Sequence, residues 1–145
     1  MPQVSKRKVN QDIETKMYET LWQAISNLKS ASDIQTFLDD LLSPTEKTML
    51  AKRLAIAALL LRKYDYQAIM DLLKVSSATV SKVVLTLNLK NGYKIAINKI
   101  ARSEATREFW KDIENLVFRM SSPGKVFLPE EVVKAKLGHR RKTLL

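Results

Sequence analysis

The chain lacks cysteine altogether, and it has 3 glycines, 4 prolines and 1 histidine among 145 residues. Without cysteine there can be no disulfide, no thiolate zinc site and no cysteine nucleophile. The scarcity of glycine and proline leaves few turn positions, which favours long helices over many short strands. No apolar run follows the basic segment 5–8, and the most apolar window, 54–61, is too short to cross a bilayer. We therefore expect an all-α, cytoplasmic protein that is not inserted in a membrane.

Residues suited to catalysis are also missing. His139 lies among arginines and lysine, with no acidic residue near it in the sequence. The acidic pairs 39–40 and 130–131 consist of adjacent residues, which point to different sides of a helix and do not readily share a metal or a substrate. There is no glycine-rich phosphate loop and no metalloprotease motif. The sequence predicts no enzymatic activity, no metal site and no cofactor.

Acidic residues are few in the middle of the chain. Hydrophobic residues make up 46% of the sequence and the net charge is +10, which indicates a folded, basic protein. Residues 43–100 hold 10 Lys/Arg against 3 Asp/Glu, for +7, whereas residues 1–42 sum to −1 and residues 101–145 to +4. A charge excess concentrated in one segment indicates a surface that meets a polyanion such as nucleic acid.

Apolar spacing predicts the helices that precede this basic segment. The intervals of four and three between apolar residues predict a helix over 10–28, and a second one starts near Ser32. Ser43-Pro44-Thr45-Glu46 has the pattern of a capping box with proline at the first helical position. The helix that follows is apolar nearly all round from residue 49 to 61, so we expect it to be the most buried element.

The predicted organisation has three parts. Residues 1–9 form a flexible basic arm, residues 10–100 form a helical DNA-binding domain, and residues 101–145 form a C-terminal helical extension with a basic tail. Within this plan we expect helices over about 93–100, 103–120 and 129–137. The apolar stripes of the first two helices are broad for so small a protein, which indicates that they also pack on a second copy of the chain.

A helix-turn-helix is predicted between residues 65 and 87. Asp65 is the expected N-cap of its first helix, and Ser76 or Ser77 that of its second. Val80, Val83, Val84 and Leu87 have the spacing of a buried stripe. The first turns of the second helix carry small and hydroxyl side chains beside a lysine, which suit a helix end that approaches bases and phosphates closely. The alternative interpretation is an ordinary helical hairpin.

Several of these segments together resemble the tryptophan repressor superfamily, and most closely its poorly characterised bacterial members. The resemblance covers about residues 21–89. It rests on Ser43-Pro44-Thr45-Glu46-Lys47, Arg53, Ile56, Leu60-Leu61-Arg62 and Ser77-Ala78-Thr79-Val80-Ser81-Lys82.

This resemblance implies an intertwined homodimer in which the early helices are exchanged between subunits. It also implies paired reading heads in successive major grooves of double-stranded DNA and a roughly palindromic operator. Five positions match residues that lie near bases or the backbone in the family. With the expected cap and the first lysine of the helix, the candidate DNA-binding residues are Gln67, Ser76, Ser77, Ala78, Thr79, Ser81 and Lys82.

The small-molecule site of the family carries over only in part. In the tryptophan-binding member the ligand's indole lies between two arginines, and Arg53 matches the first of them. Lys82 takes the place of the second and lacks a planar guanidinium that stacks on a ring. Val83 takes the place of a glycine and would crowd the ligand. Arg53 and Lys82 are therefore candidate ligand-binding residues for an unknown effector, and we expect no response to tryptophan.

These observations predict a dimeric, sequence-specific DNA-binding transcriptional regulator of the repressor type. The alternative is a nucleic-acid-binding module of a larger machine without regulatory output. A purely structural helical adaptor is disfavoured, because the positive charge concentrates on residues 43–100.

Overall fold

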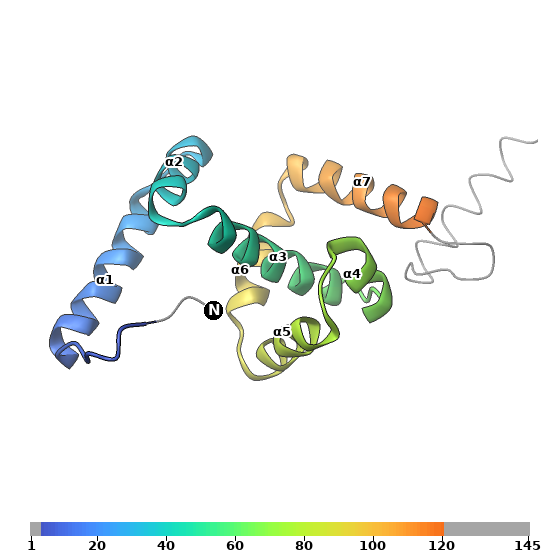
Figure 1. Ribbon diagram of the computed structural model, residues 1–145. Coiled ribbons are helices and arrows are strands. Elements are labelled where there is room, and N and C mark those ends of the chain that lie inside the picture. The colour runs from blue at the N-terminus through green and yellow to red at the C-terminus, as the bar shows by residue number, and fades with distance from the viewer. Residues whose placement is uncertain (1–3, 121–145) are drawn as a thin grey trace, which may run out of the picture. The chain divides into compact units, whose positions relative to one another are not determined.

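The computed structural model describes residues 4–120, with side chains to residue 116, and this part of the chain is helical without any strand (Figure 1). This confirms the predicted all-α class. The seven helices are α1 (Gln11–Asn27), α2 (Ala31–Leu41), α3 (Pro44–Leu61), α4 (Tyr66–Leu73), α5 (Ser77–Leu89), α6 (Gly92–Ile100) and α7 (Glu104–Met120). None of the helices within residues 4–120 is both long and apolar enough to span a membrane.

Side chains cap the starts of the first three helices. The Asn10 side chain accepts from the backbone N–H of Asp12 at 2.8 Å, and Ser30 caps α2 in the same way. The capping box of α3 is confirmed: Ser43 N–H donates to the Glu46 carboxylate at 2.9 Å, and Glu46 N–H donates back to Ser43 Oγ at 3.3 Å. The Ser43 backbone N–H, followed by its hydroxyl, lowers the pKa of Glu46 below 4.5.

The chain divides into two compact units, residues 1–48 and residues 49–145. The described part of the N-terminal unit holds α1, α2 and the start of α3, and none of its residues is buried. Its large apolar side chains remain accessible, among them Met17 at 57% and Trp22 at 58% exposure. A groove of about 540 Å³, lined mainly by Ile13, Met17, Leu21 and Phe37, runs along α1 and α2.

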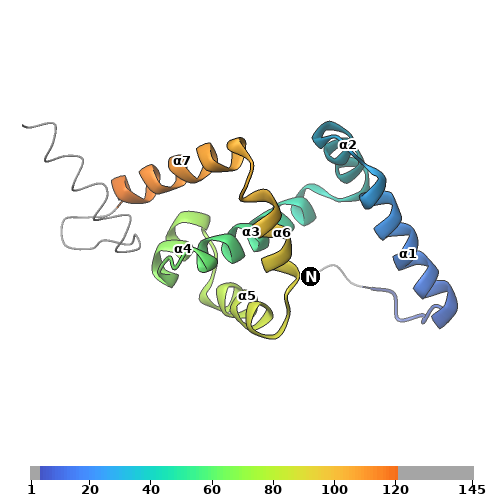
Figure 2. The same ribbon diagram turned by 180° about the vertical axis from the view of Figure 1, so that it is seen from behind.

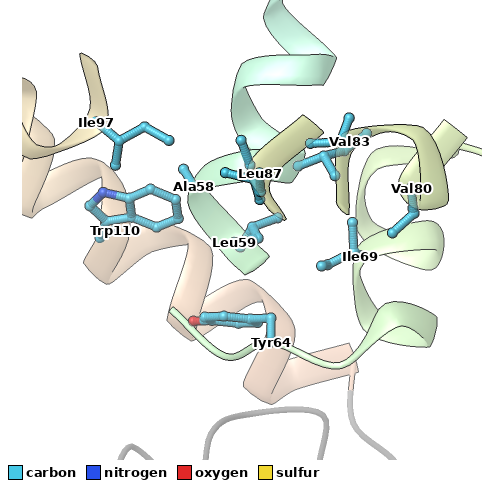
Figure 3. Packing of buried hydrophobic residues seen from close by; sticks show 11 residues of the cluster. Ala58, Leu59, Tyr64, Ile69, Val80, Val83, Leu87, Ile97 and Trp110 are labelled. Atoms are coloured by element: carbon cyan, nitrogen blue, oxygen red, sulfur yellow. The ribbon is translucent and has the colours of Figure 1, made fainter. Parts of the chain in front are cut away.

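The C-terminal unit contains the hydrophobic core. Its centre is Ile56–Leu59 of α3, which is almost fully buried. Figure 3 shows how the other helices reach this segment: Ile69 of α4 faces Val80 of α5, with the rest of the cluster beside them. The other buried members of the cluster are Tyr64, Val83, Leu87, Ile97 and Trp110. The prediction that the third helix is the most buried holds for this stretch only, because Leu50 and Leu54 are 48% and 39% exposed.

Helix α7 belongs to the same core through Trp110. The indole is 6% exposed and lies beside Ile97 and Ala58 in Figure 3. The Arg62 guanidinium stacks over the Trp110 ring at 4.2 Å and pairs with the Glu114 carboxylate at 3.4 Å. The sequence of α7 alone could not predict these contacts, because their partner, Arg62, follows the end of α3. The predicted helix over 129–137 and the basic tail lie outside the described residues.

Candidate nucleic-acid interface

The predicted helix-turn-helix forms from α4 and α5, which pack against each other (Figures 1 and 2). Lys74 ends α4 in the left-handed region with φ 52°, and its backbone N–H donates to the Met70 carbonyl. A second hydrogen bond, from Val75 N–H to the same carbonyl, turns the chain toward α5. Asp65 is the N-cap residue of α4, as predicted, although its side chain makes no capping hydrogen bond within the described residues.

The first two turns of α5 have one buried and one exposed face. Val80, Val83 and Leu87 are buried, as the stripe predicted, whereas its fourth member, Val84, is only partly buried against the same core. Four of the candidate DNA-binding residues are exposed on the other side: Ser77, Ala78, Ser81 and Lys82. Because three of these side chains are small, the backbone of this turn is open to close approach by a large partner.

Ser76 and Thr79 are engaged with each other. Ser76 Oγ accepts from the Thr79 backbone N–H at 3.3 Å, which makes Ser76 the N-cap of α5. The two hydroxyl oxygens are also 3.0 Å apart, within hydrogen-bond distance. Ser76 therefore has a clear structural role, and the half-buried Thr79 hydroxyl is partly occupied by its neighbour.

Gln67 is exposed at the start of α4, and its amide donates to the Asp71 carboxylate at 3.0 Å. Asp71 is one of only three acidic residues between positions 43 and 100. Asp71 was not among the predicted site residues, although the spacing of four residues on one helix is a sufficient signal for this contact. The pair holds the Gln67 amide along the helix and places a negative charge beside a candidate contact residue.

The remaining candidates, Arg53 and Lys82, are both exposed. Within residues 4–120 neither side chain forms an ion pair or a hydrogen bond, and neither lines the groove of the N-terminal unit or the cavity described below. Val83 is 4% exposed and packs in the core. The ligand-binding role of Arg53 and Lys82 stays a prediction. The part of the chain that the structure describes contains no cluster of three or more metal-ligating side chains.

Comparison with known proteins supports this geometry. The family model described as Trp repressor protein matches residues 16–101. An uncharacterised protein of Bacillus subtilis, YerC, is 32% identical over 90 residues, which are 61% of this chain and 86% of that protein. The crystal structure of a TrpR-like protein from Eubacterium eligens is similar with a TM-score of 0.59 and 29% identity, covering 66% of this chain and 99% of that one. A putative Trp repressor from Staphylococcus aureus has a TM-score of 0.58 at 24% identity, which shows the shared fold.

Proposed function

The chain belongs to the Trp repressor family, and we propose that it is a DNA-binding transcriptional regulator that acts as a homodimer on a defined, roughly palindromic operator. The observation that carries the proposal is the exposed face of α5, where Ser77, Ala78, Ser81 and Lys82 surround the first turns of a helix braced by a buried stripe. A helix of this kind suits the major groove, because small side chains admit the base edges and the lysine meets a phosphate.

The charge of the segment supports the same proposal. Residues 43–100 carry +7, and Lys82 has no ion-pair partner within the described residues. An unpaired lysine beside the exposed helix face is free to neutralise a phosphate and release its counterions. Such a regulator would work in the cytoplasm, a location that stays a prediction from the sequence.

The dimer is proposed from the N-terminal unit. Its two amphipathic helices bury no residue within the single chain, and the apolar groove lined by Met17 and Phe37 is open. Family membership supports a second copy of the chain as the occupant, because an exchanged pair of N-terminal helices would cover this surface. Two reading heads would then be held at a fixed separation, as a palindromic operator requires.

Tryptophan is not proposed as the effector. At the position where the family's tryptophan-binding member has glycine, this chain has Val83, which is buried in the core. A branched side chain in a packed site resists an added ring at a cost of about 1–3 kcal/mol. Titrating the operator with and without tryptophan tests this, and we expect no change in affinity. A tenfold tightening, equivalent to about 1.4 kcal/mol of coupling, would restore the corepressor role with Arg53 as its anchor.

The test of the main proposal is selection of bound duplexes from a random pool with the full-length chain. We expect enrichment of one palindromic sequence. Enrichment of duplex ends or of no common sequence would instead favour the alternative, a nucleic-acid-binding module without regulatory output.

Two substitutions then separate the roles on α5. Thr79→Ala should relax the preference at one operator position by about 1–3 kcal/mol. Lys82→Ala should weaken binding to all sequences and reduce the salt slope by about one unit. Equal and salt-independent losses from both variants would contradict the placement of α5 in the groove.

A further inference from the structure

A second cavity, of about 360 Å³, lies within the C-terminal unit. The end of α3, the first residue of α4, the second half of α5 and the start of α6 all contribute to it. Leu60, Leu61, Val84 and Leu87 form its apolar part, and the ring of the buried Tyr64 adds to it. This volume is within the range of small-molecule sites, whose walls are mostly apolar with a few polar groups. Neither Arg53 nor Lys82 takes part, so the cavity is separate from the ligand position known in the family.

The charged groups of the cavity have one sign. Lys63 and Lys94 line it, and no aspartate or glutamate does. Across the described residues neither ammonium takes part in an ion pair or a hydrogen bond. Two cations that face a partly apolar cavity without a counterion favour a ligand that carries negative charge.

Both lysines occupy positions where a lysine lowers stability. Lys63 has φ 65°, in the left-handed region that glycine adopts without strain. Lys94 lies in the first turn of α6, at the positive end of the helix dipole, where a cation is unfavourable. No acidic residue lies in that turn, and the Asn91 side chain makes no capping hydrogen bond. The stability of the folded chain therefore does not explain either lysine, whereas a bound anion would offset the cost of both.

We propose that this cavity binds a small amphipathic anion: an apolar body with one carboxylate, sulfonate or phosphate group and no amino group. The apolar walls would hold the body, and the two lysines would hold the anionic group. The exposed Asn88 amide and Tyr66 hydroxyl are further hydrogen-bonding groups at the same cavity. An amino acid would bind poorly, because its ammonium group would find no carboxylate in the cavity.

The position of the cavity links the ligand to α5. Val84, Leu87 and Asn88 come from that helix, and Leu60 and Leu61 come from the end of α3. A ligand that contacts both helices changes DNA affinity if it prefers one arrangement of α5 over another. The binding site itself does not rest on the proposed DNA-binding function, so ligand binding and DNA binding can fail independently of each other.

The experiment titrates the full-length chain with naphthylacetate, followed by calorimetry and amide chemical shifts. Neutral naphthylacetamide, zwitterionic naphthylalanine and inorganic phosphate serve as comparison probes. Naphthylacetate should bind most tightly and shift the amides of Val84, Leu87 and Lys94. Naphthylacetamide should bind up to about fivefold more weakly, because it lacks the charge that a partly exposed lysine would pair with. Phosphate should bind more weakly because it lacks the apolar body, and naphthylalanine because its ammonium group finds no carboxylate in the cavity. Equal binding of phosphate or of naphthylalanine, or shifts confined to the N-terminal groove, would overturn the proposal.

Two variants separate ligand binding from stability. Lys63→Gly removes the strained lysine, and Lys94→Glu places an acid at the start of α6, so both should raise the unfolding midpoint. Each should nevertheless weaken naphthylacetate binding by about threefold to fivefold. The matched control is Lys74→Gly, which removes the same charge from the same backbone conformation at the other end of α4, outside the cavity. It should gain stability and keep full binding.

Measuring duplex binding by the same variants shows whether the two lysines bind a small anion or the phosphates of DNA. If Lys63→Gly and Lys94→Glu weaken duplex binding while naphthylacetate does not bind the wild-type chain, the lysines serve the DNA backbone and the proposal is wrong. A loss of naphthylacetate binding in Lys74→Gly equal to that in Lys63→Gly would also contradict it.

Discussion

The two units of this protein differ in how far they bury their apolar side chains, and their two tryptophans show the difference. Trp22 in the N-terminal unit is 58% exposed, whereas Trp110 in the C-terminal unit is 6% exposed and stacks with Arg62. The described residues before Met49 bury nothing, and those from Met49 onward hold a continuous core. The helix-turn-helix therefore packs against a core that a single chain provides. The N-terminal helices have apolar surface to cover and no partner for it in the same unit, which is the physical basis of the proposed dimer.

Helix α7 lies outside the residues that match the family but packs in the core of the C-terminal unit. The family match ends at residue 101, before α7 begins, yet Trp110 is a member of the core. The guanidinium of Arg62 bridges the end of α3 to the Trp110 ring and to Glu114. A segment beyond the matched residues therefore contributes to the core of the C-terminal unit.

Truncating the two tryptophans should produce the largest contrast. Trp110→Ala should lower the free energy of unfolding by about 3–5 kcal/mol, because it leaves a cavity in a closely packed core. Trp22→Ala should change the unfolding of the C-terminal unit by less than about 0.5 kcal/mol, as expected for an exposed residue. Denaturant titration measured by far-UV circular dichroism gives both values. Similar losses from the two variants would mean that the units do not differ in the way the burial indicates.

A charge in the groove of the N-terminal unit should break the dimer. Met17→Asp puts a carboxylate on a surface that a second copy would cover, which should weaken association by about 2 kcal/mol or more. Thr15→Asp on the same helix, outside the groove lining, is the control. Sedimentation should show the wild type and the control as dimers and Met17→Asp as a monomer. A wild-type monomer at all concentrations would refute the dimer.

Two serine caps sharpen the comparison at a smaller scale. Ser76→Ala removes the cap of α5 and should lower the unfolding free energy of the C-terminal unit by about 1 kcal/mol. Ser30→Ala removes the equivalent cap of α2. Because α2 has no core of its own, we expect its effect in the dimerisation equilibrium rather than in unfolding of the C-terminal unit. Concentration-dependent thermal melts separate the two effects, and a concentration-independent loss from Ser30→Ala would contradict the contrast.

The pH dependence should be the smallest effect, with one group in each unit. The pKa of Glu46 is lowered, so its contribution is fully present above pH 4.5 and disappears as the pH falls through the lowered value. Burial, and then the Glu114 carboxylate, raise the pKa of Tyr64 from 10.0 to about 12. Its contribution is present below pH 10.0 and disappears as the pH rises toward 12. Glu46→Gln should flatten the acid limb of a stability–pH curve and Tyr64→Phe the alkaline limb; an unchanged limb would contradict the corresponding assignment.

Local patterns were sufficient to predict much of the helix that carries the candidate site and of the cap of α3. The capping box at Ser43 and Glu46 and the buried stripe of α5 could be predicted because each depends on spacing within one helix. The pairing of Gln67 with Asp71 was missed although it is equally local. The cation–π contact of Arg62 with Trp110 could not be predicted, since 48 positions separate the two residues, and neither could the cavity shared by Lys63 and Lys94.

By itself, the sequence determined the positions of the described helices, the caps of α3 and α5, the basic middle segment and the exposed character of the first turns of α5, because these follow from periodicity and composition. Only the tertiary structure decided which apolar faces are covered. Phe109 and Trp110 are neighbours of similar hydrophobicity, yet one is 51% and the other 6% exposed. The apolar pattern of a helix indicates which face is buried. The surface that covers this face comes from segments distant in the sequence, and their positions depend on the packing of the whole unit.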